Sequence, residues 1–193
     1  MARFPTAEER WPRAGEVIKE KMFFLENLEK ELKSIEKEII EDCVKSLENI
    51  DYDMGNNYQV FTRHHDKLYS LFIESCKKKF NNFTIKNSET KLWANYTDEN
   101  YNPNQSWHNH ETSCTLCGVL YLETVENCGI KLKHDNEITY IEPKKYDLLV
   151  FPGFLNHLPI VHKTKRRISL QFEISCIEDI KNIWSQKGIE FFV

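Results

Sequence analysis

After residue 87 the chain changes in character, and this change constrains its fold more than any other feature of the sequence. Short runs rich in Val, Ile, Tyr and Phe alternate there with Asn, Asp, Pro and Gly. Short strands at this spacing are typical of an antiparallel sandwich or barrel rather than of a parallel sheet. We predict eight strands, over residues 90–96, 106–110, 114–123, 129–133, 137–142, 146–151, 158–162 and 166–174.

The chain before this point has mainly helical periodicity. Hydrophobic residues recur in steps of three and four from Leu28 to Leu47, with Glu and Lys between them. This pattern predicts an amphipathic helix over 27–49, and a similar pattern predicts a second helix over 60–80. The remaining expectations are a strand or helix start over 17–25, a loop over 51–58, a short helix over 179–186 and a closing strand over 189–193.

Helices followed by strands indicate an α+β fold in which helices brace one face of a β-sandwich. The 193 residues suit a single domain with its own hydrophobic core. Within that domain we expect a helical support region over 1–87, a jelly-roll core over 88–176, and a C-terminal helix and strand over 177–193.

Composition narrows the classes of protein to consider. No apolar run approaches the ~18 residues of a membrane span, and a net charge of −4 gives no sign of a nucleic-acid surface. The first residues lack the apolar core of a secretory signal, so the six cysteines are expected to be reduced thiols in a cytoplasmic environment. Cys114 and Cys117 are three apart in a predicted strand and are expected on opposite faces, which disfavours a redox or zinc site.

Three histidines in the strand-rich part are candidates for binding a metal. His108 and His110 are two apart in a predicted strand, so both imidazoles can lie on one face and reach one ion. His157 follows a strand that ends at Pro152-Gly153, and a jelly roll can bring this histidine back to the first pair. Neutral imidazole is a good ligand for Fe, Zn, Cu and Ni, although a pair of polar core residues would give the same H-x-H pattern.

Arg167 and Ser169 share one face of the last predicted strand. A guanidinium inside a barrel needs an anion, and its forked geometry suits a carboxylate. The hydroxyl of Ser169 would add a second donor, so the two side chains would form a seat for a carboxylate ligand. The alternative is that Arg167 pairs with an internal Asp or Glu at the sheet edge.

Five motifs, taken in order, resemble those of the Fe(II)/2-oxoglutarate-dependent oxygenases, in particular small bacterial and viral members akin to the prolyl hydroxylases. The motifs are Trp-Ala-Asn, His-x-His, Gly-Val-x-Tyr-Leu, Phe-Pro-x-x-x-x-His and Arg-Ile-Ser, and they span residues 93–172. The resemblance implies a double-stranded β-helix, a jelly roll like that of the cupins, braced by the N-terminal helices. It also implies Fe(II), 2-oxoglutarate as cosubstrate, O₂, and a hydroxylation that releases succinate and CO₂.

The resemblance also assigns roles to individual residues. His108 and His157 occupy the places of metal-binding histidines. Arg167 occupies the place that holds the distal carboxylate of 2-oxoglutarate, assisted by Ser169 and Tyr121. The side chains expected to line the pocket or contact substrate are Trp93, Asn95, Cys117 and Val119.

The second metal ligand departs from the usual pattern of this family. Most members have Asp or Glu two residues after the first histidine, whereas this chain has His110 there and Glu111 one position later. A three-histidine site with His110, a local shift that brings in Glu111, and a vacant position are the three possibilities. Because Glu111 would point to the opposite face of a regular strand, we favour His110.

The other histidines are expected to lie outside the metal site. The stretch His64-His65-Asp66 contains a literal His-x-Asp, but on a helix the side chains at i and i+2 diverge. His162 lies too close to the arginine motif, and His134 is typical of an exposed turn.

Two other functions fit parts of the pattern. A cupin-type three-histidine metal dioxygenase would not use 2-oxoglutarate and would leave Arg167 and Ser169 without an obvious role. A jelly-roll binding protein without catalysis is the second alternative. The sequence indicates neither the substrate, small molecule or peptidyl, nor the oligomeric state, but the loops over 98–105 and 125–128 are expected to flank the pocket mouth.

Overall fold

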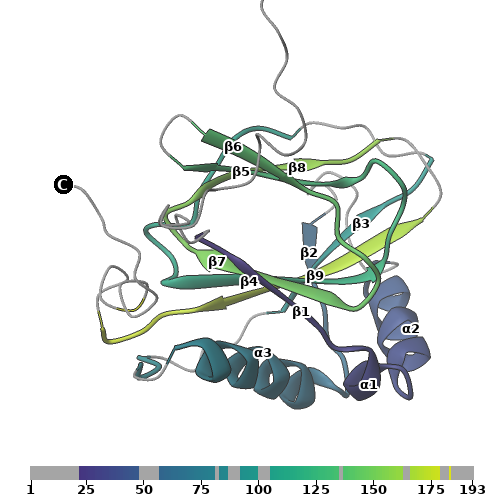
Figure 1. Ribbon diagram of the computed structural model, residues 1–193. Coiled ribbons are helices and arrows are strands. Elements are labelled where there is room, and N and C mark those ends of the chain that lie inside the picture. The colour runs from purple at the N-terminus through teal and green to yellow at the C-terminus, as the bar shows by residue number, and fades with distance from the viewer. Residues whose placement is uncertain are drawn as a thin grey trace, which may run out of the picture.

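Two antiparallel sheets face each other, and the helices lie against the larger one (Figure 1). The larger sheet has the order β1-β7-β4-β9-β3-β2, and the smaller sheet has the order β6-β5-β8. This arrangement is a jelly-roll sandwich, as predicted. The computed structural model describes residues 22–47, 57–80, 83–86, 92–99, 105–134, 137–162, 166–178 and 183.

All strand pairs within the two sheets are antiparallel. The larger sheet contains β1 (Phe24–Asn27), β7 (Asp147–Pro152), β4 (Leu116–Glu123), β9 (Arg167–Ile174), β3 (Trp93–Thr97) and β2 (Asn57–Gln59). The smaller sheet contains β6 (Glu137–Ile141), β5 (Gly129–His134) and β8 (Asn156–Ile160).

Seven of the predicted strands are confirmed within a few residues, as β3 to β9. The strand predicted over 106–110 is wrong, because only His108 pairs there, through an isolated bridge to His157, before a turn at 111–113. The loop predicted over 51–58 is wrong at its end, where β2 begins at Asn57. The helix predicted over 179–186 and the strand predicted over 189–193 lie outside the described residues, apart from the single position Ile183.

The long helix predicted over 27–49 is interrupted. Only its first residue, Asn27, belongs to β1, which pairs with β7, and the main-chain N–H of Leu28 donates to the carbonyl of Tyr146. Of the segment over 17–25, expected to be a strand or a helix start, Phe24 and Leu25 lie in this strand. The chain then forms α1 (Glu29–Leu32), a turn at 33–35 and α2 (Glu36–Leu47). The predicted helix is thus broken by the turn, and its hydrophobic stripe is buried or half-buried.

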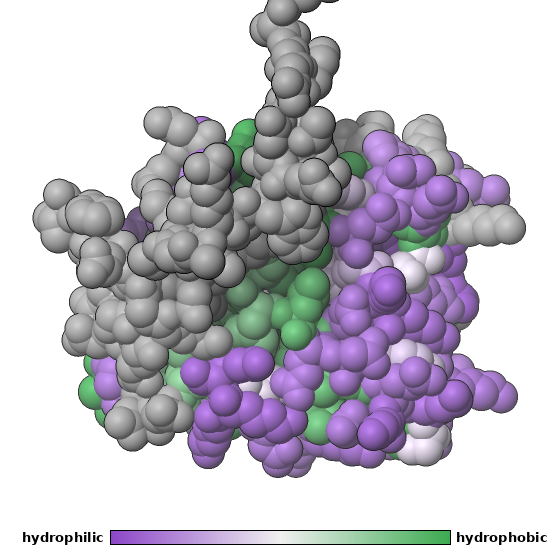
Figure 2. Space-filling view, in the orientation of Figure 1, coloured by the Kyte–Doolittle hydropathy of each residue, from purple (hydrophilic) through white to green (hydrophobic). Residues whose placement is uncertain are grey.

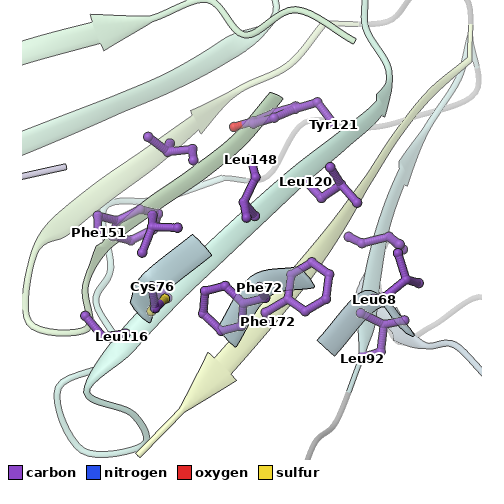
Figure 3. Packing of buried hydrophobic residues seen from close by; sticks show 14 of the residues in the cluster. Leu68, Phe72, Cys76, Leu92, Leu116, Leu120, Tyr121, Leu148, Phe151 and Phe172 are labelled. Atoms are coloured by element: carbon purple, nitrogen blue, oxygen red, sulfur yellow. The ribbon is translucent and has the colours of Figure 1, made fainter. Parts of the chain in front are cut away.

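Part of the hydrophobic core lies between the larger sheet and α3 (His65–Lys79), and buried residues of the smaller sheet such as Ile130 and Leu132 belong to the same cluster. The ring of Phe172 on β9 packs against two rings of α3, with centroids 5.2 Å from Phe72 and 5.4 Å from Tyr69. Figure 3 shows the first of these contacts at close range, with Leu68 and Cys76 of α3 on either side. The helix predicted over 60–80 is thus confirmed, but it begins at His65.

The register of the larger sheet puts polar side chains on its other face, toward the smaller sheet. Ser169 lies directly between Asn95 of β3 and Tyr121 of β4, so the three residues form one cross-strand row. These three side chains line a pocket between the sheets, together with residues such as Ile130 of β5. Among the described helices, none combines the length and apolar character required to cross a bilayer.

Candidate metal centre and carboxylate pocket

His108, His110 and His157 meet at one end of this pocket. One ring nitrogen from each lies within 4.8 Å of the others, which is close enough for a single ion to bind all three. The ring centroids of His108 and His157 are 4.2 Å apart, and the rings of His110 and His157 are stacked with centroids 5.1 Å apart. The structure therefore brings together the three histidines predicted from the sequence.

Main-chain hydrogen bonds fix the positions of these residues. His108 N–H donates to the carbonyl of His157 at 3.1 Å, and His157 N–H donates back to the carbonyl of His108 at 2.8 Å. The next turn of the chain is tied down where His110 N–H donates to the carbonyl of Gly153 at 2.7 Å. The segment carrying His108 and His110 is thus fastened to β8 and to the turn that precedes it.

Gly153 is required at that turn by close packing. A Cβ atom at this position would lie 2.2 Å from the carbonyl oxygen of Cys114, a contact that real side chains do not make. The missing side chain lets the turn between β7 and β8 approach the segment that follows His110. The Pro-Gly signal in the sequence therefore helps to position the candidate metal-binding histidines.

Each of the three imidazoles is oriented by a hydrogen bond from its Nδ1. His108 Nδ1 bonds the carbonyl of Ser106 at 2.9 Å, and His157 Nδ1 bonds the carbonyl of Leu155 at 3.0 Å. A carbonyl oxygen only accepts, so both Nδ1 atoms carry the proton, and in a neutral imidazole of this form Nε2 keeps a free lone pair. Such partners are typical of histidines that bind metals through Nε2.

His110 has a charged partner instead of a carbonyl. Its Nδ1 lies 2.7 Å from a carboxylate oxygen of Glu173 on β9. This hydrogen bond is the main cause that holds the pKa of Glu173 below its ordinary value. The carboxylate is thus ionised at neutral pH and accepts a hydrogen bond from Nδ1 of His110, which leaves Nε2 as the nitrogen that can face a metal.

His157 is the most buried of the three histidines, at 5% exposure. Burial is the main cause that lowers the pKa of His157 to about 4, against the opposing hydrogen bond to Leu155, and the neighbouring His108 and His110 lower it further. The imidazole is therefore neutral at physiological pH, which is the form that binds a metal.

Arg167 lies in the same pocket without an anionic partner among the described residues. It is 3% exposed, its Nη1 donates to Asn95 at 3.1 Å, and its guanidinium lies 5.4 Å from the ring centroid of Tyr121. Its Nε is buried without a hydrogen bond, and no carboxylate in the described part of the chain forms an ion pair with it. The alternative expectation, an internal Asp or Glu beside Arg167, is not what these residues show.

The groups around Arg167 are polar and uncharged. Ser169 is 1% exposed and lines the pocket with Tyr121 and Asn95. Burial raises the pKa of Tyr121 to about 12, although the nearby Arg167 acts to lower it, so the phenol keeps its proton at neutral pH. A buried guanidinium beside hydroxyl groups, with no counter-charge from a described residue, is an arrangement that suits an anion, because an uncompensated buried charge is costly.

The structure places most of the other predicted pocket residues as expected. Cys117 and Val119 line the pocket, and so does Gln105 at the end of the predicted mouth loop. Trp93 is half-buried on β3 and is not among the lining residues, nor are residues 125–128.

Two lining residues of β9 were not predicted from the sequence. Gln171 and Glu173 continue the alternation that begins with Arg167 and Ser169, and all four side chains line the pocket. The signal was present in the sequence, since residues two apart on a strand share a face. Extending the arginine motif by two more steps would have found both.

Cys114 and Cys117 do not point to opposite faces, which corrects the sequence-based expectation. Their sulfur atoms lie 3.1 Å apart, and both residues are buried. The prediction failed because β4 begins only at Leu116, so Cys114 is not part of the regular strand.

The remaining histidines lie away from the triad. His64 Nε2 is 3.0 Å from Glu38, and His65 opens α3, as the helical periodicity had indicated. His134 is exposed at the end of β5, and His162 is exposed after β8. Glu111 is exposed in the turn after His110 and is not part of the cluster that could hold a metal.

Comparison with solved structures identifies the architecture. A prolyl 4-hydroxylase from Phytophthora capsici superposes with a TM-score of 0.64 at 12% sequence identity, over 83% of this chain and 60% of that one. This chain therefore spans less than two thirds of that protein. A prolyl hydroxylase from Trichoplax adhaerens, in complex with a hypoxia-inducible factor peptide, gives a TM-score of 0.57 at 11% identity, over 89% of this chain and 88% of that one.

The chain has the double-stranded β-helix fold of the Fe(II)/2-oxoglutarate-dependent oxygenases. A viral collagen prolyl hydroxylase from Paramecium bursaria Chlorella virus-1 shares this fold with a TM-score of 0.53 at 17% identity, over 91% of this chain and 98% of that one. No protein-family model matches the sequence, and no curated protein matches it. The likeness to this fold is thus carried by three-dimensional arrangement rather than by sequence identity.

Proposed function

We propose that the chain is a non-haem Fe(II)- and 2-oxoglutarate-dependent dioxygenase. It would hydroxylate a substrate with O₂ while 2-oxoglutarate is converted to succinate and CO₂. The observation that carries this proposal is that three metal-competent histidines and a buried arginine, without a counter-charge from any described residue, line one pocket. Histidine clusters and buried arginines each occur separately in proteins of many functions, but together they match a metal and a dicarboxylate bound side by side.

The donor set fits a divalent iron ion. His108, His110 and His157 each present a free Nε2, and imidazole is a common ligand of non-haem iron. When bound, the iron would supply the activation of O₂ for the decarboxylation of 2-oxoglutarate and the oxidation of substrate. Three protein ligands leave coordination positions for the cosubstrate and for O₂.

The residues of this chain would bind and orient the cosubstrate. The Arg167 guanidinium would pair with the distal carboxylate of 2-oxoglutarate, and the hydroxyls of Ser169 and Tyr121 would donate to the same group. Since these three side chains are 3%, 1% and 1% exposed, water would be excluded from this end of the pocket. A dry site strengthens the ion pair and protects a reactive centre.

The proposal is tested with Arg167→Met, which keeps the side-chain length and removes the charge. We expect 2-oxoglutarate to bind the Mn(II)-loaded variant about 30-fold more weakly or worse, because breaking a buried charge pair costs at least ~2 kcal/mol. Titration calorimetry under anaerobic conditions measures this affinity. Mn(II) binding itself should be unchanged, since Arg167 contacts none of the three histidines.

Arg166→Met is the matched control. It removes the same charge one residue earlier, but Arg166 pairs with Glu123 through two hydrogen bonds of 2.6 Å on a partly exposed surface. We expect normal 2-oxoglutarate affinity in this variant. If Arg167→Met bound 2-oxoglutarate as tightly as the wild type, the assignment would be wrong.

Aerobic turnover separates the remaining alternatives. Succinate formed from 2-oxoglutarate with Fe(II) supports the proposed class. Consumption of O₂ without 2-oxoglutarate would instead indicate a three-histidine metal dioxygenase of the cupin type, and a protein that binds both ligands without turnover on any substrate would be a binding protein.

A further inference from the structure

The carboxylate of Glu173 distinguishes His110 from the other two histidines. His108 and His157 donate from Nδ1 to main-chain carbonyls, which are neutral acceptors. Of the three, His110 alone donates to a charged acceptor, at 2.7 Å. Such a charge-assisted bond is stronger than a neutral one, and it raises the basicity of the imidazole at its other nitrogen.

Glu173 is also isolated from other acids near the pocket. Among the described lining residues it is the only carboxylate, and it lies on the same face of β9 as Arg167, toward the opposite end of the strand. Across the sheet it faces Cys117 of β4, which is buried and neutral. Its single charge is therefore directed to the histidine end of the pocket.

Iron sites with two histidines and one carboxylate place a negative charge directly on the ion. In this chain His110 replaces that carboxylate, and the ligand set would be neutral. Glu173 would restore one negative charge, which would act on the ion through the imidazole of His110. The local charge of the loaded site would then equal that of the usual ligand set.

Resting on the proposed function, we propose that Glu173 is a positioning residue that compensates for the missing carboxylate ligand. It fixes the Nδ1-protonated form of His110 and supplies, through that imidazole, the negative charge that the ligand set lacks. The geometry of His110, Glu173 and the two carbonyl-bonded histidines carries this inference.

Glu173→Gln tests it, because glutamine has the same size but no charge. We expect Co(II), used as a spectroscopic probe, to bind the variant on the order of 10- to 100-fold more weakly. The d–d absorption of bound Co(II) should also shift, since the donor strength of His110 changes. Thermal unfolding of the metal-free protein verifies that the variant folds.

Glu111→Gln is the matched control. Glu111 is exposed and adjacent to His110 in sequence, so its removal changes the charge near the site by the same amount. We expect unchanged Co(II) affinity and an unchanged absorption spectrum. An equal loss in this variant would mean that the charge acts non-specifically, or that Glu111 is itself a ligand, and would overturn the inference.

A second readout does not require metal. Long-range ¹⁵N NMR of the metal-free wild type should show all three histidines protonated on Nδ1. In Glu173→Gln the amide can donate as well as accept, so His110 should become a mixture of tautomers while His108 and His157 remain unchanged. A wild-type His110 protonated on Nε2 would contradict the proposed role.

Failure of this inference is distinguishable from failure of the proposed function. Metal binding that is lost in His157→Ala but is unaffected in Glu173→Gln would overturn the role of Glu173 alone. A wild-type protein that binds no Co(II) would overturn both.

Discussion

The eight residues of β9 alternate between its two faces, one of which is polar and the other hydrophobic. On the side of the smaller sheet the strand presents Arg167, Ser169, Gln171 and Glu173, which line the pocket. On the side of the helices it presents Ile168, Leu170, Phe172 and Ile174, each at most 3% exposed. One strand thus belongs to both the polar site and the hydrophobic core.

The difference shows where stability and function are located in this molecule. The rings that pack between the larger sheet and α3 lie outside the sandwich, whereas the space between the sheets holds the polar residues of the pocket beside apolar ones such as Ile130 and Phe151. Figure 2 shows hydrophobic residues in the middle of one outer face of the molecule, with hydrophilic residues to the right of them and below them. Substitutions on the two faces of β9 should therefore have different consequences.

The largest effect is expected on the helix side. Phe172→Ala removes a ring that contacts both Phe72 and Tyr69, and should lower the free energy of unfolding by about 3–5 kcal/mol. Chemical denaturation measures this change. Phe172→Leu, with a loss below about 1.5 kcal/mol, provides a folded variant if the alanine variant does not fold.

Gln171→Ala is the matched substitution on the opposite face. Gln171 is adjacent to Phe172 on β9 but lines the pocket, so the two substitutions compare the two faces directly. We expect Gln171→Ala to lower the free energy of unfolding by less than about 1 kcal/mol. Equal losses at positions 171 and 172 would mean that the two faces contribute alike to stability.

The next substitution is expected to increase the stability of the ligand-free protein. Arg167→Met should raise the stability of the ligand-free protein by about 1–4 kcal/mol, because an apolar side chain replaces a buried charge whose Nε has no hydrogen bond to a described residue. Thermal unfolding without 2-oxoglutarate measures the stability of the ligand-free protein, and unfolding with 2-oxoglutarate measures how much the ligand stabilises it. Only the wild type should gain stability from the ligand. A destabilised variant would show that Arg167 serves the fold rather than a ligand.

The smallest effect is expected at Asp42, a carboxylate of the helical layer that is stabilised by several hydrogen bonds. Asp42 of α2 accepts hydrogen bonds from Thr62 Oγ1 at 2.8 Å and from the main-chain N–H of Arg63 at 3.3 Å. Burial acts to raise the pKa of Asp42, but these bonds and the Arg63 charge outweigh it and hold the pKa below its ordinary 3.8. In contrast to Arg167, removing this charge should cost stability.

We expect Asp42→Asn to lower the free energy of unfolding at pH 7 by about 1–2 kcal/mol. A lowered folded-state pKa stabilises the fold above the unfolded-state pKa, and this contribution is lost as the pH falls through the folded-state value. The difference between wild type and variant should therefore shrink below about pH 4. Urea denaturation across this range checks the sign, and a constant difference would contradict it.

Much of this site could be predicted because its signals are local. The spacing of residues in a strand or turn determines where their side chains point. This rule applies to the H-x-H pair, to the histidine after the Pro-Gly turn and to the Arg-x-Ser pair. The eight predicted strands came from the same kind of signal, and the incorrect one, over 106–110, still placed both histidines correctly. There the direction of the side chains is set by the bridge to His157 rather than by a regular strand.

The features that the sequence did not reveal depend on distant contacts or on where a strand begins. The bond between His110 and Glu173 joins residues of two segments far apart in the chain, and no local pattern specifies it. The meeting of Cys114 and Cys117 depends on β4 starting at Leu116, a boundary finer than periodicity can resolve. The strand β1 pairs with the distant strand β7, and this contact decides between the strand and the helix start that were both expected over 17–25.

The reciprocal main-chain bonds between His108 and His157 have a consequence for engineering. Two of the three ligand positions are held by backbone atoms, which every amino acid except proline can supply. The side chains at these positions can therefore be exchanged for other ligand types without relocating the point where they converge. This chain would serve as a framework in which one coordination geometry is offered to several metals, with selectivity set by the chosen side chains alone.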